Sequence, residues 1–225
     1  MIIGLDVGGT NVNAVAIKQG KIVDTAKNPT DYSNLLGCIW TTLHQLLVSN
    51  RREKIQHINL STTVSTNAIV EGNTAPVGMI IESGPGLDPS FLCCGTENVL
   101  INGYIDHRGR EISPLNKKEI DQAIELFESK NIRAVSVAGK FSTRNPAHEL
   151  DIAMSLKDRF SPITLGHTLS GKLNFPRRVY TSYLNSAIYD VFSKFADGIK
   201  NAMKREGLEV PTYILKADGG TVNIA

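Results

Sequence analysis

The residues best suited to chemistry lie at the start of the chain, between Ile2 and Ile17. An apolar run ends in an aspartate, two glycines and two polar residues follow, and a second apolar run begins. The residues of interest between the two runs are Asp6, Gly8, Gly9, Thr10 and Asn11. Glycines can adopt φ > 0 and expose successive backbone N–H groups to an anion, and a carboxylate can hold a divalent cation. The set therefore predicts a site for Mg²⁺ and a nucleoside phosphate, with Asp6 on the metal. The alternative is a glycine hairpin with a solvated aspartate.

A second polar group follows the next strand, which we predict from Ile55 to Ser61. Thr62, Thr63 and Asn67 belong to a hydroxyl-rich segment there. Hydroxyls at the end of a strand can line a polar pocket, and they can also cap a helix. Both interpretations stay open, and the first would place these residues beside the bound phosphate or substrate.

Two further candidates for catalysis are His167 and Asp218. His167 follows a short predicted strand, and ligands gather at strand ends in α/β folds. An imidazole there could act as an acid, a base or a metal ligand. Asp218 precedes two glycines, which again places an acid beside bare backbone. Arg144, Asn145 and His148 are weaker candidates, because Asn145 and Pro146 have a complete explanation as a helix start.

The spacing of apolar residues predicts an α/β fold that positions these groups. Two strands form a hairpin around the glycines, and a third strand follows at 22–26. An amphipathic helix at 32–49, the strand at 55–61 and a short helix to residue 71 come next. From about residue 112 helices and strands alternate, as in parallel α/β units. We expect two regions, 1–110 and 111–225, and no second hairpin strand after the glycines that follow Asp218.

The composition is that of an ordinary globular protein of 225 residues, with 41% hydrophobic and 20% charged residues. The net charge of +2 gives no case for binding nucleic acid or an anionic membrane. The three cysteines form no C-x-x-C pair, so no disulfide framework or zinc site is predicted. No signal peptide is evident, and no apolar run approaches the roughly 18 residues of a membrane span. We therefore expect a cytoplasmic protein.

Several segments resemble known families. Asp6 to Thr10 resembles the first phosphate loop of the actin-like ATPase superfamily, which includes sugar kinases and heat-shock chaperones. Four other segments resemble, in the same order, motifs of the hydantoinase/5-oxoprolinase family, A-type chain. They are Leu60 to Glu71 ("G-T-T-x-A-T-N-A-x-x-E"), Ser142 to Glu149 ("S-x-R-N-P-x-H-E"), Ile163 to Ser170 ("x-S-H-E-V-x") and Lys216 to Gly220 ("K-S-D-G-G"). The resemblance runs from the first residue to the last. At His167 it departs from the family motif, because a threonine replaces the glutamate that follows the histidine.

This resemblance implies a ribonuclease-H-like first domain of the actin-like ATPase fold, followed by a second α/β region. It implies ATP and Mg²⁺ as cofactors and an ATP-dependent hydrolase subunit. The substrate would be a cyclic amide or imide, such as a hydantoin or 5-oxoproline, which the enzyme opens through a phosphorylated intermediate. A B-type hydantoinase chain is the implied partner, and a homo-oligomer is possible.

Family members are usually more than twice this length and carry a second phosphate loop further along. We therefore expect the second nucleotide-binding half to be absent from these residues, and ATP to bind them weakly or not at all. Two alternatives remain open. One is a small-molecule kinase of the same superfamily, and the other is a truncated, non-catalytic module that binds a partner or an effector.

Overall fold

The computed structural model describes residues 1–50, 53–216 and 219–224. The chain forms two compact units, Met1–Asn73 with Asp190–Ala225, and Thr74–Tyr189. This division differs from the single boundary expected near residue 110. The chain leaves the first unit after residue 73 and returns to it through one long helix, α6 (Phe175–Arg205), which contributes to both units. Consecutive stretches of sequence therefore do not correspond to the units.

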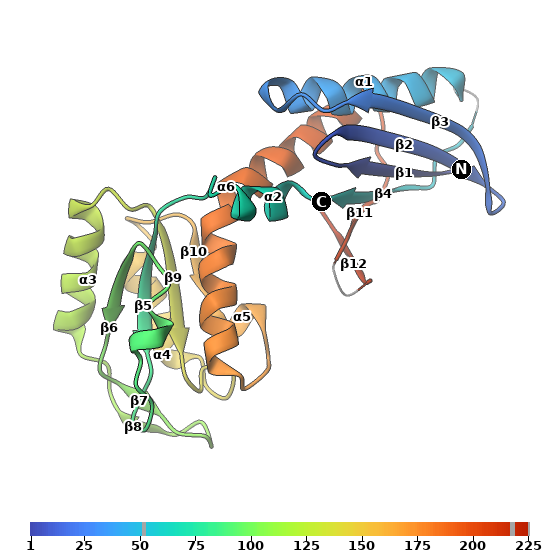
Figure 1. Ribbon diagram of the computed structural model, residues 1–225. Coiled ribbons are helices and arrows are strands. Elements are labelled where there is room, and N and C mark those ends of the chain that lie inside the picture. The colour runs from blue at the N-terminus through green and yellow to red at the C-terminus, as the bar shows by residue number, and fades with distance from the viewer. Residues whose placement is uncertain (51–52, 217–218, 225) are drawn as a thin grey trace. The chain divides into compact units, whose positions relative to one another are not determined.

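The first unit is built on a six-stranded mixed sheet (Figure 1). In spatial order the strands are β12 (Thr221–Asn223), β11 (Thr212–Leu215), β4 (His57–Thr62), β1 (Ile2–Val7), β2 (Asn11–Lys18) and β3 (Lys21–Pro29). Strands β1, β2 and β3 are antiparallel neighbours, whereas β4 lies parallel to β1, and β11 lies parallel to β4. This arrangement confirms the predicted ribonuclease-H-like order of three strands, a helix, a strand and a helix.

Helix α1 (Leu35–Ser49) covers one face of this sheet, after a single 3₁₀ turn, η1 (Tyr32–Asn34) (Figure 1). Its apolar residues recur at helical spacing, and Ile39, Leu43 and Leu46 are buried as the sequence predicts. They share a core with alternate residues of β1 and β2 and with the second half of α6. Alternation along a strand sends every second side chain to the same face, so one face of the sheet is sealed by apolar contacts.

The end of this sheet corrects one expectation. A second hairpin strand, β12, does follow the glycine turn, and it pairs antiparallel with β11 from Leu215 opposite Thr221 to Tyr213 opposite Asn223. All three residues of β12 are exposed. With only three residues, none of them buried, the strand is too short for a period of two to predict it.

The second unit contains a four-stranded sheet in which all neighbours are parallel. Its strands, in spatial order, are β10 (Ile163–Leu165), β9 (Ala134–Gly139), β5 (Val77–Glu82) and β6 (Glu97–Leu100). The second unit also contains the 3₁₀ turn η2 (Ser90–Leu92), the small hairpin of β7 (Tyr104–Ile105) and β8 (Glu111–Ser113), and the helices α3 (Lys117–Ser129), α4 (Ala147–Leu156) and α5 (Gly166–Leu169). Helix α2 (Val64–Val70) belongs to the first unit. The parallel order agrees with the predicted alternation of helices and strands.

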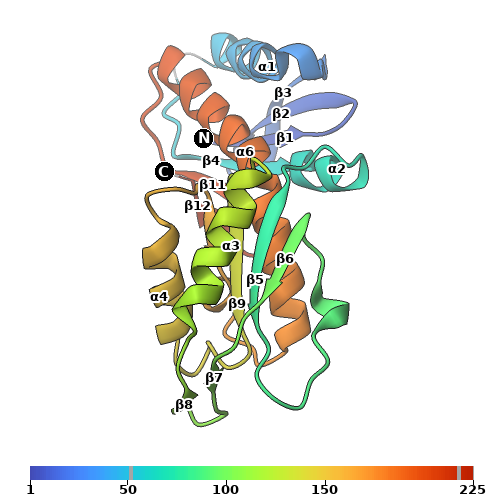
Figure 2. The same ribbon diagram turned by 90° about the vertical axis from the view of Figure 1, so that its left-hand side faces the viewer.

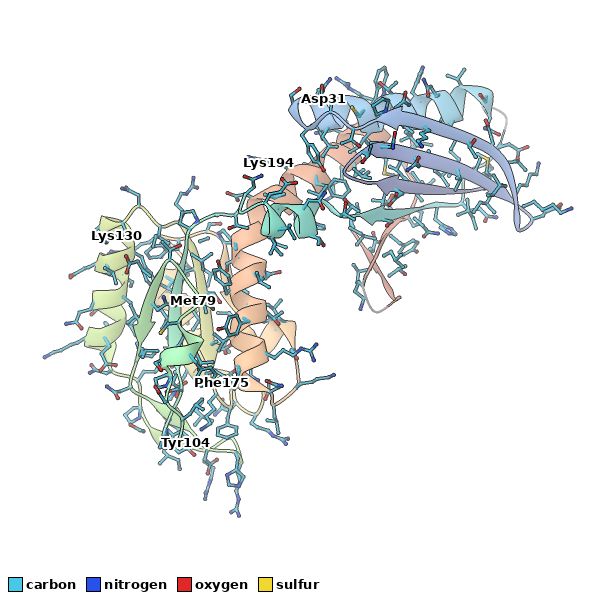
Figure 3. All side chains as sticks on the ribbon, viewed as in Figure 1. Asp31, Met79, Tyr104, Lys130, Phe175 and Lys194 are labelled. Carbon is cyan, nitrogen blue, oxygen red and sulfur yellow. The ribbon has the colours of Figure 1, made fainter. Side chains whose placement is uncertain are left out.

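Helices cover both faces of this parallel sheet, and α3 and α6 lie on opposite sides of it in both ribbon views (Figures 1 and 2). Successive residues of β5 face the two sides in turn. Ile80 joins a core with Phe127 of α3, whereas Met79 packs with Phe175 and Val179 of α6. Figure 3 labels Met79 and Phe175 within this unit. A sheet covered on both faces requires apolar residues throughout its strands, and every residue of β5 is buried.

Helix α4 begins one residue later than predicted. Pro146 is its N-cap, Ala147 is its first residue, and it ends at Leu156. The side chain of Asn145 still accepts a hydrogen bond from the backbone N–H of Ala147 at 3.0 Å. The predicted asparagine therefore still caps the start of the helix, although it lies one residue before the N-cap position.

Candidate functional site

The phosphate loop, residues Asp6 to Asn11, lies at the carboxyl end of β1, where the chain turns into β2. Asp6 lies opposite Asn13 of β2 and Ser61 of β4, and its side chain is exposed. The turn closes with a hydrogen bond from the N–H of Gly8 to the carbonyl of Asn11 at 3.1 Å. The sheet thus holds the carboxylate at its edge, beside a short turn.

The loop is braced by a single threonine that follows β3. The hydroxyl of Thr30 donates to the carbonyl of Gly8 at 2.8 Å, and its N–H donates to the carbonyl of Thr10 at 2.9 Å. Both bonds occupy carbonyl groups of the loop, which are repulsive toward an anion. The bracing therefore leaves the loop better suited to phosphate.

The two glycines are needed for space rather than for an unusual backbone conformation. Neither Gly8 nor Gly9 has a positive φ, contrary to the expectation from the sequence. A Cβ on Gly9 would lie 3.2 Å from Nδ2 of Asn67 and 3.4 Å from the hydroxyl of Tyr32. A side chain at this position would therefore press on two polar groups that flank the loop.

The structure brings two of the predicted neighbours, Thr62 and Asn67, to the phosphate loop. The Thr62 hydroxyl donates to the carbonyl of Val7 at 3.1 Å and accepts from the N–H of Val64 at 3.1 Å, so it ties the start of α2 to the end of β1. Thr63 is the N-cap residue of α2, without a capping hydrogen bond from its side chain. Both interpretations of this segment are thus represented. Thr62 is used locally, and Asn67 reaches the loop.

Tyr32 is a neighbour of the loop that the sequence did not reveal. Its hydroxyl accepts a hydrogen bond from Nδ2 of Asn67 at 3.1 Å. The two residues line one cavity of about 460 Å³ in the first unit, together with Lys194 of α6, which Figure 3 labels. Tyr32 lies in the 3₁₀ turn before α1, where the sequence pattern indicates only a helix start. Its role depends on the distant segment that α2 brings beside it.

The donor set of the loop fits Mg²⁺ bound with a phosphate. Mg²⁺ prefers one or two carboxylates together with waters and phosphate oxygens, rather than an all-protein cage. Asp6 supplies one exposed carboxylate, and Thr10 and Asn11 supply polar side chains beside it. Within residues 1–50, 53–216 and 219–224, no group of three or more His, Cys, Asp or Glu side chains could hold a metal by itself. The loop therefore suits a metal that arrives with its ligand.

A second set of polar residues, the carboxylate–imidazole cluster, lies within the second unit at the carboxyl ends of three neighbouring parallel strands. Its members are Glu82, His148, Glu149, His167 and Arg178. Glu82 ends β5, and His167 follows β10 in α5, while His148 and Glu149 begin α4. Gly139, the last residue of β9, separates the two carboxylates, because a Cβ there would lie 3.0 Å from Oε2 of Glu82 and 3.8 Å from Cγ of Glu149.

The two histidines of this cluster are held differently. Nδ1 of His148 lies 3.0 Å from Glu82, and its Nε2 lies 3.2 Å from Glu111 of β8. Nδ1 of His167 lies 2.6 Å from Oε2 of Glu149, which also accepts the backbone N–H of His167 at 3.0 Å. Glu149 thus supplies the carboxylate partner that the sequence near His167 lacks.

Arg178 is the largest of the fully buried side chains in the described part of the chain, at 1% exposure. Its guanidinium donates to the carbonyls of Gly139 and Lys140 at 2.7 Å each and to that of Lys172 at 2.7 Å. It therefore fastens the chain at the end of β9 to the loop that precedes α6. Its guanidinium also lies near Glu149, and the charge of that carboxylate favours the charged form of the guanidinium.

Burial and charge compete at this cluster. Burial raises the pKa of Glu82, although the hydrogen bond and charge of His148 oppose this shift, and the negative charge of Glu149 adds to it. Burial by itself would lower the pKa of His148, but the hydrogen bonds and charges of Glu82 and Glu111 outweigh it and raise that pKa. Burial lowers the pKa of Arg178. The cluster is thus an ionic network held in a poorly solvated place.

The remaining predicted residues are accounted for as follows. Arg144 is exposed, and Asn145 bridges to the carbonyl of Gly109 at 3.0 Å in addition to its bond at the start of α4. Asp218 lies outside the described residues, so its catalytic role stays a prediction. The sequence missed Glu82, Glu149 and Arg178 as members of a site. Glu149 carried a signal, because it ends a segment that resembles a family motif, and Arg178 begins the stretch of helix that resembles the family's next segment.

The strand order of the first unit and the glycine turn after β1 define a ribonuclease-H-like domain of the actin-like ATPase fold. The chain belongs to the hydantoinase/oxoprolinase family, whose N-terminal region matches residues 2–160 and whose hydantoinase/oxoprolinase region matches residues 178–225. The family predicted from the sequence is thereby confirmed.

Relatives and solved structures agree with this assignment. The chain is 25% identical to the caprolactamase subunit alpha of Pseudomonas jessenii, over 97% of this chain and 35% of that protein. It is 21% identical to the acetophenone carboxylase gamma subunit of Aromatoleum aromaticum, over 99% of this chain and 36% of that protein. The chain therefore spans about a third of the length of these relatives.

Two solved structures share the fold over nearly the whole chain. The ATP-dependent caprolactamase of Pseudomonas jessenii matches with a TM-score of 0.80 at 22% identity, covering 98% of this chain and 36% of that one. Nucleotide-free acetone carboxylase, described as part of ATP-dependent acetone carboxylation, matches with a TM-score of 0.81 at 16% identity, covering 99% of this chain and 37% of that one.

Proposed function

We propose that this chain is the phosphate-loop part of an ATP-dependent hydrolase subunit that opens a cyclic amide or imide, of the hydantoin or 5-oxoproline kind. The observation that carries the proposal is the exposed Asp6 at the end of β1, beside the Gly8–Gly9 turn. The likeness to two enzymes that are described as ATP-dependent supports ATP as the energy source, and the likeness to a caprolactamase supports a cyclic amide as the substrate.

In this proposal ATP supplies the phosphoryl group that activates the amide oxygen, and the phosphorylated intermediate is then hydrolysed. Phosphoryl transfer requires positioning and neutralisation of charge more than covalent protein chemistry. Asp6 holds Mg²⁺. The N–H of Gly9 and the side chains of Thr10 and Asn11 bind phosphate oxygens, while Gly8, whose N–H closes the turn onto the carbonyl of Asn11, lets the phosphate approach the loop. Asn67 and Tyr32, which lie beside Gly9 of the loop, also line the neighbouring cavity.

We further propose that these residues form one half of a nucleotide site and that the second half lies in sequence outside them. The chain's span of about a third of its relatives supports this. A B-type chain is the proposed partner, because two of the relatives are named as subunits. Within the described ranges no helix has both the length and the apolar character needed to cross a membrane. A cytoplasmic location stays a prediction.

The test is substitution of Asp6 in the complete protein together with its partner chain. Asp6→Ala should lower amide-dependent ATP hydrolysis by about 100-fold or more, as expected when one electrostatic contact to the transition state is lost. Asp197→Ala, at an exposed position on α6 of the same unit, is the matched control and should leave turnover unchanged. Unchanged turnover in Asp6→Ala would refute the assignment of this residue.

The products distinguish the alternatives. Ring-opened product with free phosphate supports the hydrolase, whereas a stable phosphorylated product would identify a kinase. Absence of ATP consumption across hydantoins, 5-oxoproline and lactams, with the partner chain present, would favour a non-catalytic module.

A further inference from the structure

Glu149 and His167 form a close pair in which each partner is fixed by a different part of the second unit. Oε2 of Glu149 lies 2.6 Å from Nδ1 of His167 and 3.0 Å from its backbone nitrogen. The other carboxylate oxygen accepts the N–H of Gly139 at 2.8 Å. The Glu149 side chain is 1% exposed, whereas that of His167 is 19% exposed. A buried carboxylate thus holds a ring that reaches solvent.

These contacts determine which ring nitrogen carries the proton. Two backbone N–H groups already donate to the Glu149 carboxylate, and an ionised carboxylate can only accept hydrogen bonds. The imidazole must therefore donate from Nδ1, which leaves the lone pair of the neutral ring on Nε2. In the described part of the chain no hydrogen-bond partner lies at this nitrogen.

His148 shows what a purely structural histidine in the same place looks like. Both of its ring nitrogens contact carboxylates, one from Glu82 and one from Glu111, and its side chain is 4% exposed. It has no nitrogen left to exchange a proton with a substrate. Of the two histidines, only His167 has one ring nitrogen bonded to a carboxylate and the other without a partner among the described residues. It lies at the strand ends where α/β folds bind ligands.

We propose that His167 is the proton-transfer residue for the hydrolytic half of the reaction and that Glu149 is its positioning residue. This inference rests on the proposed function. Water adds across the carbon–nitrogen double bond of the phosphorylated amide. The water oxygen bonds to the carbon as its proton moves to Nε2 of His167, the π electron pair moves onto the substrate nitrogen, and the proton then passes from Nε2 to that nitrogen. The carbon–nitrogen single bond of this adduct then breaks: its electron pair leaves on the nitrogen, which takes the proton of the new hydroxyl through Nε2, and the carbonyl of an acyl phosphate forms. A second water attacks the acyl phosphate and releases the carboxylate and inorganic phosphate.

Glu149 acts only through His167 in this step. Its carboxylate fixes the Nδ1–H tautomer and stabilises the imidazolium while the proton resides on Nε2. Two other charged groups lie beside the Glu149–His167 pair: Glu82, across Gly139, and the guanidinium of Arg178. The charge of Glu149 raises the pKa of Glu82 and opposes the lowering of the pKa of Arg178 by burial. His148 and Glu111 lie beyond Glu82.

The experiment compares variants of the complete protein with its partner chain, in a single turnover with ATP and a cyclic amide. In Glu149→Gln and His167→Gln we expect ADP formation within about 3-fold of wild type and ring opening slowed by about 100-fold, the range for one general acid–base group. Glu128→Gln, an exposed carboxylate paired with Arg159 in the same unit, is the matched control. Ring opening at the wild-type rate in His167→Gln would overturn the proposal.

Two further readouts separate positioning from a structural role. Glu149→Asp should restore part of the rate. Nitrogen NMR of His167 should show the proton on Nδ1 in wild type and a mixture of tautomers in Glu149→Gln. A proton on Nε2 in wild type would contradict the pair, and absence of ADP formation in wild type would instead refute the proposed function.

Discussion

The two polar sheet edges of this protein, one in each unit, are built in opposite ways. At the end of β1 the side chains of Asp6 and Thr10 are exposed, and the loop is braced mainly through the two bonds from Thr30. At the ends of β5, β9 and β10 all members of the cluster except the partly exposed His167 are buried, and its carboxylates and imidazoles contact one another. The first edge leaves its polar groups for a ligand, whereas the second satisfies most of them internally.

This difference predicts how each edge responds to substitution. An exposed group contributes little to folding, so its loss should affect ligand binding alone. A buried charge that loses its partner leaves an uncompensated group in a poorly solvated place, which is costly. Substitutions in the phosphate loop should therefore affect ligand binding, whereas substitutions in the carboxylate–imidazole cluster should affect stability.

The largest effect on stability is expected at Arg178. Arg178→Ala removes the donor to three carbonyl groups and opens a cavity, so it should lower the free energy of unfolding by about 3 to 5 kcal/mol. Urea unfolding followed by circular dichroism measures this change. Trp40, the single tryptophan, lies in the first unit, whereas Arg178 lies in the second. The unfolding midpoint followed by tryptophan fluorescence should therefore change less than the midpoint followed by circular dichroism.

Arg177→Ala provides the matched control for this change. Arg177 is the preceding residue of α6 and is exposed, so its substitution should alter stability by no more than about 0.5 kcal/mol. A loss below about 1 kcal/mol in Arg178→Ala would mean that the buried cluster does not hold the second unit together.

A smaller effect is expected from pH through His148. Its pKa is raised in the folded protein, so the stabilisation it gives is complete below the unfolded-state pKa of about 6.5 and is lost as the pH rises through the folded value. The free energy of unfolding should fall over that range by at most about 1.4 kcal/mol per pH unit. Glu82 titrates in the same sense, because its pKa is also raised, chiefly by burial.

Urea unfolding at a series of pH values tests this dependence. His148→Gln should flatten it, whereas His107→Gln, at an exposed histidine of the same unit, should retain the wild-type dependence. Stability that increases with pH above 6.5 in wild type but not in His148→Gln would contradict the sign of the effect.

The smallest effect on stability is expected at the phosphate loop. Gly9→Ala places a methyl group 3.2 Å from Asn67 and 3.4 Å from Tyr32, which can adjust because both side chains lie near the surface. Unfolding should change by less than about 1 kcal/mol. Binding of ATP by the complete protein, measured by calorimetric titration, should nevertheless weaken by about 10-fold, because the loop N–H groups become less accessible.

Gly171→Ala is the matched control, since a Cβ there meets no atom within 4 Å. ATP affinity should remain at the wild-type value in that variant. Equal affinity in wild type and Gly9→Ala would show that the loop does not approach the phosphate closely.

Much of this architecture could be predicted from the sequence, because it depends on local patterns. The glycine turn, the buried stripe of α1 and the alternation of helices and strands are all written in neighbouring residues. The strand β12 could not be predicted, since it has only three residues and all of them are exposed. The unit boundaries could not be predicted either, because they depend on where α6 returns the chain.

The sequence by itself determined the family, the candidate phosphate loop and the position of His167 after a strand. Tertiary structure alone decided which groups meet. Tyr32 reaches Asn67 across 35 positions, and Glu149 reaches His167 across 18. The physical reason is that a turn or a helix follows from interactions over a few residues, whereas a hydrogen bond between side chains depends on how whole elements pack. Gly9 of the loop illustrates both. Its presence was evident from the sequence, but the space that it leaves for Asn67 and Tyr32 was evident only from the fold.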